Sequence, residues 1–509
     1  MRSKLLFLCL SLTACQDFQL GEVEQPLLGG GDFSAEAFGA LPDDGTDDRD
    51  GLQAAVQSAC DAGGGIVRLR AGLYELGPNP LLGATNIESV SVRCSNVRIT
   101  GEGLSTVLQA TGDGGGGDWN LIQIRTSPSN AAPVRNVEID HMLLSGAGAW
   151  NTDEQTHLIQ IGIGPVEGVS LHHLWFHHPV RQKQDLAGGS ERGGDCIRIM
   201  GGPGKPVRFT QITDSQFLNC DRTAIGFQRE AYDTIVDSNI FMVVGDQHID
   251  QEPSGAGALG RFVITNNLFL FGSQGAHSVT LTGNAVDEPS SEIVFSQNVL
   301  FGRGLSLYNV QRAVVSDNVI MGKIPSAEGV IQARKANFDI LLRGNHVERL
   351  PGSATGPVIS VVPHNSGFPT RWKIEGNRIV NGVDGYPISL ESISNTSVTN
   401  NDIEFRGPTT GTYAAVRLRA SLGVVENTLI LGNRSLGPLA SMIQLAPAPH
   451  AIGAVSIVGN MAHGAPAGVV CNGSGSFLKP IVHSGNYYDG ATTVASHCPT
   501  SLSLVAQYP

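Results

Sequence analysis

Asparagine recurs through the C-terminal half of this chain at a nearly constant interval. In most repeats an apolar residue stands three positions before the asparagine, and another stands two positions after it. The mean interval is about 27 residues, within the range of periods that marks solenoids and repeat arrays. The predicted members are Asn239, Asn267, Asn298, Asn318, Asn345, Asn377, Asn401, Asn427, Asn460 and Asn486. This interval predicts that one kind of supersecondary unit recurs along the chain.

The repeated unit has the composition of short strands joined by turns. Residues 262–269, Phe-Val-Ile-Thr-Asn-Asn-Leu-Phe, combine alternating apolar side chains with turn residues. No helical stripe separates such stretches, which disfavours leucine-rich and βαβ repeats. We expect each asparagine at a bend, where it bonds neighbouring backbone groups and the asparagine of the next repeat. Intervals of 20 to 33 residues suit coils with loops of different length better than propeller blades. The pattern therefore predicts an all-β parallel β-helix.

Composition agrees with a solenoid and excludes one class of partner. The chain has 509 residues, of which 64 are glycine and only 6% are aromatic. A repeat array grows without splitting into domains, so we expect one elongated domain. The net charge of −13 argues against a nucleic-acid partner. An acidic polysaccharide would need a local basic site.

The N-terminus has the pattern of an export signal. A basic start at residues 1–4 precedes the apolar run of residues 5–12, which is too short to span a bilayer. Residues 12–15, Leu-Thr-Ala-Cys, resemble the bacterial lipobox. The resemblance implies cleavage before Cys15, lipidation of Cys15 and a lipoprotein anchored through that lipid at the outer membrane or cell surface. The alternative is an ordinary secretory peptide with an incidental cysteine.

Six cysteines remain when Cys9 and Cys15 are set aside. An even number in an exported protein suggests disulfides. Two of the spacings, 27 and 24 residues, are about one coil and would place the partners on neighbouring turns. The predicted pairs are Cys471 with Cys498, Cys196 with Cys220 and, by elimination, Cys60 with Cys94.

Residues 33–75 differ from the repeats. Residues 50–60 form an amphipathic pattern with acidic residues at its start, which predicts a helix that covers the apolar end of the solenoid. The segments 38–40, 43–48 and 71–74 resemble the entry motif of the pectate-lyase-like superfamily, which includes polygalacturonases, polysaccharide lyases and phage tailspikes. The resemblance implies a right-handed parallel β-helix solenoid with an N-terminal capping helix. It says little about activity, because one fold hosts many chemistries.

These patterns divide the chain into five segments. We expect a lipoprotein signal peptide at 1–14, a linker at 15–30, the N-terminal cap at 31–80, the β-helix at 81–490 and a C-terminal cap or tail at 491–509.

Ionisable residues concentrate between positions 150 and 255, in three expected strands at 195–199, 224–229 and 248–252. Aligning them on Ile197, Ile225 and Ile249 directs these side chains into the core, because side chains alternate across a strand. The opposite face then carries Arg198, Gly226, Gln228, Asp250 and Glu252, with Asp195, Arg222 and Arg229 at its rims. We expect an extended polysaccharide on this face, walled by the turn at 179–194.

Glycoside hydrolysis is the reaction that this patch predicts first. Asp250 and Glu252 can serve as acid and base, which inverting glycosidases hold about 6.5–9.5 Å apart. Asp195 partly resembles the Asp-Asp-Cys motif of polygalacturonases, but Gly194 replaces the first aspartate and the Gly-His-Gly motif of that family is absent. The predicted catalytic residues are Asp250, Glu252, Asp195, Arg222 and Arg229, and the predicted substrate-binding residues are Arg198, Gln228, Lys183, Arg192 and His248.

Other functions stay open. A polysaccharide lyase would use an arginine or lysine as base, with Ca²⁺ held by Asp250 and Glu252, and a C5-epimerase would use similar parts. A non-catalytic glycan-binding or envelope scaffold protein is the alternative from another class, and the oligomeric state, monomer or homotrimer, is undetermined. No metal site is predicted, because the five histidines His157, His172, His173, His177 and His178 lack metalloprotease spacing and are expected in turns and at the surface.

Overall fold

A computed structural model of the protein describes residues 30–79, 87–111, 119–127, 132–146, 156–177, 194–253, 259–270, 277–284, 288–364, 367–408, 412–479, 481–489, 493–498 and 503–504. The export signal with Cys15, and the predicted substrate contacts Lys183 and Arg192, lie outside these residues.

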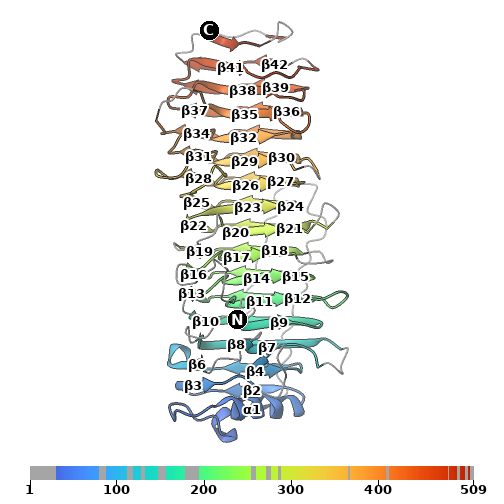
Figure 1. The fold of residues 1–509 in the computed structure, drawn as a ribbon, viewed down its shortest axis with the longest axis vertical. Coiled ribbons are helices and arrows are strands. Elements are labelled where there is room, and N and C mark those ends of the chain that lie inside the picture. Colours follow the sequence, from blue (N-terminus) through green and yellow to red (C-terminus); the bar gives the residue numbers. More distant parts are fainter. Residues whose placement is uncertain are drawn as a thin grey trace, which may run out of the picture.

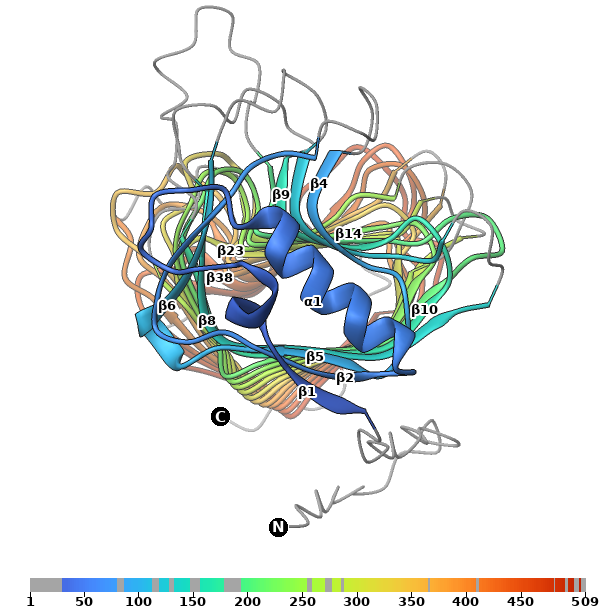
Figure 2. The ribbon, with the colours of Figure 1, turned by 90° about the horizontal axis from the view of Figure 1, so that it is seen from below.

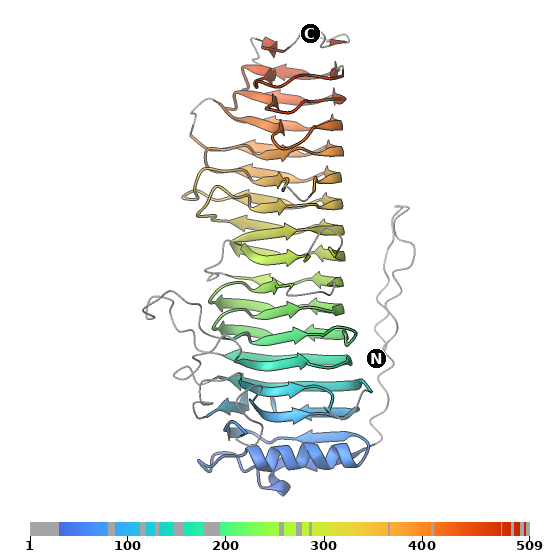
Figure 3. The same cartoon turned by 45° about the vertical axis from the view of Figure 1, so that its right-hand side comes forward.

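The chain winds as a parallel β-helix with three strands in each turn (Figures 1 and 3). One turn consists of β14 (Ile225–Gln228), β15 (Ala231–Asp237) and β16 (Ile240–Val244). Each strand pairs in parallel with its counterpart in the next turn: β17 (Ile249–Gln251), β18 (Gly260–Thr265) and β19 (Leu268–Phe269). The predicted parallel β-helix is confirmed. Its right-handed sense stays a prediction.

One face of the solenoid is a sheet of 15 strands, and this sheet carries the candidate site. It contains β4 (Ile87–Val92), β7 (Trp119–Ile124), β9 (His157–Gly162), β11 (Ile197–Met200), β14, β17, β20 (His277–Thr282), β23 (Gly304–Tyr308), β26 (Ile331–Arg334), β29 (Ile359–Val362), β32 (Ile388–Glu391), β35 (Ala414–Ala420), β38 (Ser441–Pro447), β41 (Ala467–Cys471) and β44 (Thr493–Ser496).

The other two strands of each turn belong to a sheet of 30 strands. Its two halves are joined by β8 (Val134–Ser145) and β10 (Val166–His177), which run through the corner between the halves. One half of β10 pairs with β12 (Val207–Thr213) and the other with β13 (Gln216–Cys220). From this turn onward, the corner separates two shorter strands.

The asparagine ladder occupies this corner, as predicted. The side-chain oxygen of Asn267 accepts hydrogen bonds from the backbone N–H of Asn239 at 3.0 Å and from its Nδ2 at 3.1 Å. The same Nδ2 also donates to the carbonyl of Ile212 at 2.8 Å. The pattern repeats from turn to turn as far as Asn486. Every amide in the ladder is therefore buried with its hydrogen bonds made, as a polar group in a solenoid interior requires.

One predicted member of the ladder is wrong. Asn433, rather than Asn427, lies between Asn401 and Asn460. The side chain of Asn427 is exposed, its backbone is left-handed at φ +50°, and its Nδ2 bonds Asn395. The misplacement has a physical cause: Val424, three positions before Asn427, is an exposed valine outside the core, whereas Ile430 before Asn433 is buried.

The predicted helix covers the N-terminal end of the coil (Figure 2). Helix α1 (Arg49–Asp61) contacts β1 (Gly31–Ser34), β2 (Gly65–Arg68), β4 and β5 (Val97–Thr100). Its buried side is made by Leu52, Ala55, Val56 and Ala59. An apolar helix face thus closes the apolar cross-section of the first turns.

All three predicted disulfides are present. Cys60–Cys94, Cys196–Cys220 and Cys471–Cys498 have Cα separations of 5.5, 5.6 and 4.8 Å. The spacing argument holds because one coil brings residues about 25 positions apart to the same place on the axis. Within the described part of the chain, we find no helix of the length and apolarity that a membrane span needs.

Candidate active site

The predicted register of the three charged strands is confirmed. Ile197 pairs with Ile225, and Ile225 with Ile249, and all three side chains are fully buried. The next position pairs Arg198 with Gly226 and Gly226 with Asp250. Arg198 and Asp250 therefore share the side of the sheet opposite the core, whereas Gln251 of β17 pairs with Phe227 on the core side.

Asp195 lies at the centre of a buried network rather than at the rim of the patch. Its carboxylate accepts hydrogen bonds from Arg198 Nη1 and from Arg222 Nε and Nη2, each at 2.9 Å. Burial alone raises the pKa of Asp195, but the adjacent guanidinium groups outweigh it and hold the pKa at about 2. Asp195 is fully enclosed and stays ionised, and its catalytic role stays a prediction.

Glycine at position 226 lets this network form. Arg198 starts on β11, crosses β14 at Gly226 and reaches Glu252 beside β17. A Cβ at position 226 would lie 2.5 Å from both Arg198 Nη1 and Asp195 Oδ2. A side chain there would therefore displace the guanidinium group.

Glu252 is the member of the network that reaches solvent. Its Oε2 accepts hydrogen bonds from Arg198 Nη2 at 2.9 Å and Gln228 Nε2 at 3.3 Å, and lies 3.5 Å from Arg222 Nη2. The Glu252 side chain is 37% exposed, against 1% for Arg198 and 7% for Arg222. Both arginines lie beneath Glu252 and support it, and the substrate contact of Arg198 stays a prediction.

The environment of Asp250 is the opposite of that of Glu252. Its side chain is almost fully buried, and no hydrogen bond to it occurs within the described residues. Burial, followed by the charges of Glu252, Asp246 and Asp195, raises the pKa of Asp250 well above its usual range. Both guanidinium groups are ion-paired with Asp195 and Glu252, so the protonated form of Asp250 is favoured.

His248 is buried, which contradicts its predicted contact with substrate. Its ring packs edge-on against Phe241 and Phe269, and its Nε2 lies 3.1 Å from the carbonyl of Met242. Burial lowers the pKa of His248 to about 4. The corner before β17 turns this side chain inward, where a polymer outside the coil does not reach it.

Two other predictions concern flanking residues. Arg229 follows β14 in a left-handed bend at φ +48° and is partly exposed, and its catalytic role stays a prediction. His157, expected at the surface, is buried instead, and its Nδ1 accepts a hydrogen bond from the backbone N–H of Asp195 at 3.0 Å. His157 thus supports the loop that presents Asp195.

A polar row that sequence reasoning missed extends from the site along the 15-stranded sheet. Each residue of the row pairs with its counterpart in the next turn, about 4.8 Å away. The repeat register, once known, would have identified the row. Its members beside Arg198 and Asp250 are Gln123, Gln160, Thr280, Ser306, Gln332, Ser360, Ser389 and Arg417.

Side-chain groups that can hold a metal ion occur on other strands of the described part of the chain. One is His141 with His172 and His173, and the other is Glu138 with Asp140 and His172, all on β8 and β10. Both lie on the 30-stranded sheet, whereas Asp250 is on the 15-stranded sheet and Glu252 directly follows its strand β17.

Comparison with known proteins finds no matching family model. Two curated relatives are mannuronan C5-epimerases of Azotobacter vinelandii. AlgE3 is 41% identical over 85 residues, which are 16% of this chain and 4% of the relative. AlgE1 is 52% identical over 46 residues, 9% of this chain and 3% of the relative. The chain thus matches only a small part of either relative's length.

Three solved structures align with most of the chain at low identity. The A-module of mannuronan C-5 epimerase AlgE6 from Azotobacter vinelandii has 15% identity and a TM-score of 0.43, covering 92% of this chain and 100% of its own. The GH87 alpha-1,3-glucanase catalytic unit from Streptomyces thermodiastaticus strain HF3-3 has 14% identity and a TM-score of 0.46, and the alignment covers 92% of this chain and 70% of the glucanase. The exopolygalacturonase from Thermotoga maritima has 12% identity and a TM-score of 0.45, and the alignment covers 79% of this chain and 92% of the exopolygalacturonase. Alignments this loose assign neither a site nor a substrate.

Proposed function

We propose that this protein is a carbohydrate-active enzyme that cleaves a polysaccharide by hydrolysis at Asp250 and Glu252. One observation carries the proposal: two carboxyl groups two positions apart on one face have opposite environments. Asp250 is buried with a raised pKa, whereas Glu252 is half-exposed and ion-paired with Arg198. A pair of carboxyl groups divides the roles of acid and base when the two environments favour opposite protonation states.

In the proposed reaction, Asp250 donates its proton to the glycosidic oxygen as the bond from that oxygen to the anomeric carbon breaks. Glu252 accepts a proton from a water molecule whose oxygen bonds to the anomeric carbon. The products are two shorter glycans, and the proton on Glu252 returns to Asp250 through solvent. Residues two apart on a strand are about 6.5–7 Å apart at Cα. This spacing suits the inverting arrangement, in which a water molecule fits between the carboxyl groups.

The arginines favour hydrolysis over elimination or epimerisation. A lyase or an epimerase acting on a uronate needs a cation that neutralises the substrate carboxylate. Arg198 and Arg222 are nearly inaccessible, and their hydrogen bonds go to Asp195 and Glu252. They therefore orient Glu252 and place positive charge beside it.

C5-epimerisation or lyase cleavage of a uronate polysaccharide is the second candidate. The local sequence identity to two mannuronan C5-epimerases supports it. In that case Asp250 and Glu252 would bind Ca²⁺, and the ion would neutralise the substrate carboxylate. A non-catalytic glycan-binding or scaffold role is the third candidate.

We also propose, from the N-terminal sequence alone, that the protein is exported and anchored through lipid on Cys15. Mass spectrometry of the mature N-terminus is the test. A diacylglyceryl-modified Cys15 is expected, and an unmodified mature terminus after another residue contradicts the proposal.

An activity screen separates these functions. Purified protein is incubated with neutral and uronate-containing polysaccharides, with and without EDTA, while reducing ends and ultraviolet absorbance are followed together. New reducing ends without absorbance indicate hydrolysis, and rising absorbance indicates a lyase. Altered uronate signals in the proton NMR spectrum without cleavage indicate an epimerase. Binding without turnover across the panel would overturn the enzyme proposal in favour of a glycan-binding protein.

A further inference from the structure

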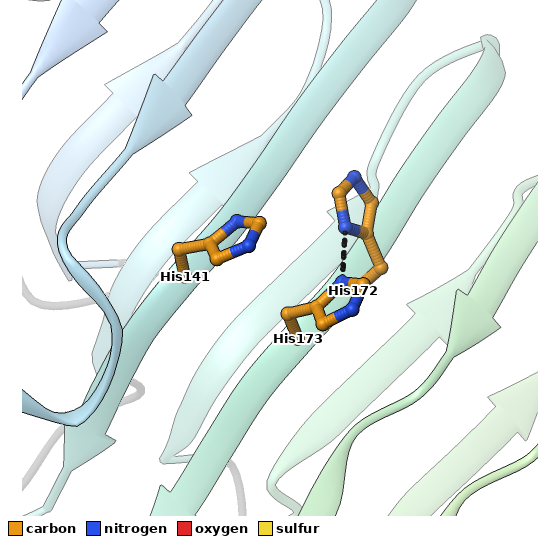
Figure 4. A group of neighbouring side chains, drawn as sticks. All are labelled: His141, His172 and His173. Carbon is orange, nitrogen blue, oxygen red and sulfur yellow. Dashed lines mark hydrogen bonds between the residues drawn. The ribbon is translucent and has the colours of Figure 1, made fainter.

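Three histidines from two neighbouring turns meet on the 30-stranded sheet (Figure 4). His141 is on β8, and His172 and His173 are on β10. One ring nitrogen of each lies within 4.8 Å of those of the other two. The rings of His141 and His173 are stacked at 4.7 Å, and His172 Nδ1 lies 2.9 Å from His173 Nδ1.

The backbone holds the cluster in place. The register of β8 and β10 sets His173 level with His141, at the solenoid corner. Both have left-handed backbone, with φ of +52° and +54°, like Asp214 at the same corner in the next turn. The column of corner residues therefore points two imidazoles in the same direction, one turn apart.

Carboxylates orient two of the rings. His141 Nδ1 lies 2.6 Å from Asp140 Oδ1, and His172 Nε2 lies 3.0 Å from Glu138 Oε1. Each carboxylate accepts an N–H, which leaves the lone pair of His141 Nε2 for a metal ion. The lone pair of His172 Nδ1 accepts the N–H of His173 Nδ1, and a metal ion would take the place of that proton. A histidine ligand that donates its other N–H to a carboxylate is the usual arrangement around protein-bound metals.

The Asp140 carboxylate is itself held rigidly. It is fully buried and accepts hydrogen bonds from Arg98 Nε at 2.7 Å, from Arg98 Nη2 at 3.1 Å and from Thr100 Oγ1 at 2.6 Å. A partly buried arginine and a buried threonine thus hold the residue that orients one imidazole. This arrangement goes beyond what an incidental group of surface histidines needs.

We propose that His141, His172 and His173 form a binding site for a divalent transition metal ion such as Zn²⁺, with a fourth coordination position open to solvent. Imidazole nitrogen is a ligand of Zn²⁺, Cu²⁺ and Ni²⁺, whereas Ca²⁺ and Mg²⁺ take oxygen. Ligand nitrogens of a tetrahedral Zn²⁺ are about 3.4 Å apart, given bonds of about 2.1 Å. The candidate ligand nitrogens lie within 4.8 Å of one another, and His172 Nδ1 and His173 Nδ1 are 2.9 Å apart. Rotation of the exposed His173 and partly exposed His141 rings would bring them to the tetrahedral spacing. The ion would clamp β8 to β10.

The test is titration of the untagged full chain with ZnCl₂ in competition with a chromophoric chelator, alongside CaCl₂ and MgCl₂. We expect one Zn²⁺ per chain, bound far more tightly than Ca²⁺ or Mg²⁺. His173→Ala, which removes a ligand, should weaken Zn²⁺ binding more than tenfold. Glu138→Gln, which removes an orienting carboxylate, should weaken it about 10–100-fold. Co²⁺ should give the visible absorption of a tetrahedral nitrogen site in the wild-type protein and lose it in His173→Ala.

His346→Ala is the matched control. His346 is also on a strand, β28 (His346–Arg349), beside a carboxylate, Glu348 at 3.5 Å, but outside the three-histidine cluster. Its Zn²⁺ affinity should equal that of the wild-type protein. Melting temperatures in EDTA establish that the variants are folded. Wild-type affinity in His173→Ala, equal affinity for Ca²⁺, or one ion shared between two chains would overturn the proposal.

Discussion

The turns that carry the asparagine ladder and those that carry the candidate site solve the same problem in different ways. In the ladder, each buried polar group bonds an identical group one turn away, so a single solution repeats from Asn239 to Asn486. At the site, Asp195, Arg198 and Glu252 form one network of charges that occurs once. Repetition satisfies polar groups without creating a distinctive place on the surface. At the site, by contrast, Glu252 is half-exposed, and Arg198 and Arg222 are ion-paired with Asp195 and Glu252 rather than with Asp250.

The ladder begins within the site, because Asn239 follows β15 in the turn whose first strand is β14. In the turn before Asn239, Ser215 takes the corner position, and its N–H donates to Asn239 Oδ1 at 3.0 Å. One turn earlier, the N–H of Leu174 donates to Ser215 Oγ at 3.1 Å, and the histidine cluster occupies the adjacent corner. Departures from the repeat thus coincide with groups capable of chemistry.

The largest expected effect is on activity. Asp250→Asn or Glu252→Gln should each lower kcat about 10²–10⁴-fold, because each removes one partner of the acid–base pair. Initial rates on a polysaccharide that the wild-type protein cleaves provide the measurement. In the wild-type protein the rate should fall as pH rises through the raised pKa of Asp250, because the acid loses its proton.

Glu404→Gln is the control for this prediction. Glu404 is paired with Arg406 on the 30-stranded sheet, outside the candidate site. Its activity should equal that of the wild-type protein. Full activity in both site variants would exclude Asp250 and Glu252 as the reacting pair.

The next effect concerns stability. Asp195→Ala leaves two buried guanidinium groups without their shared partner and should lower the free energy of unfolding by about 3–5 kcal/mol. Asp339→Ala breaks an exposed pair with Arg371 and should cost less than about 1 kcal/mol. Urea unfolding of both variants measures the difference. Equal losses would mean that the network of the site contributes no more than a surface ion pair.

Acid should weaken the same network. The pKa of Asp195 is about 2 in the folded protein and about 3.9 when unfolded. Its contribution is therefore complete above pH 4 and is lost as pH falls through 2, a change of about 2–3 kcal/mol. Unfolding free energies of wild type and Asp195→Asn, measured from pH 5 to 2, should converge toward the acid end. A constant gap would refute the low pKa.

The smallest effect distinguishes Asn318, a member of the ladder, from Asn427, which lies outside it. Asn318→Ala leaves neighbouring amides and a carbonyl without partners and should cost about 1–3 kcal/mol. Asn427→Ala changes an exposed residue and should fall within about 0.5 kcal/mol of the wild-type protein. Thermal or urea unfolding is the measurement, and a loss at Asn427 as large as at Asn318 would contradict the assignment of Asn433.

The sequence by itself determined the features that repeat with the coil. The asparagine interval predicted the parallel β-helix, and the coil length predicted the pairs Cys196–Cys220 and Cys471–Cys498. Side-chain alternation predicted the register of Ile197 with Ile225. These inferences succeed because period and alternation are properties of the chain that neighbouring turns must respect when they stack.

Only the tertiary structure decided what happens at the corners and between turns. Local pattern did not distinguish Asn433 from Asn427, and it did not bring His141 to His172 and His173, because those contacts depend on which side chain faces the next turn. It also did not reveal that Asp195 and His248 are enclosed. Enclosure arises where two turns and their loops pack together, and the direction of a side chain at a bend follows from the backbone angle there.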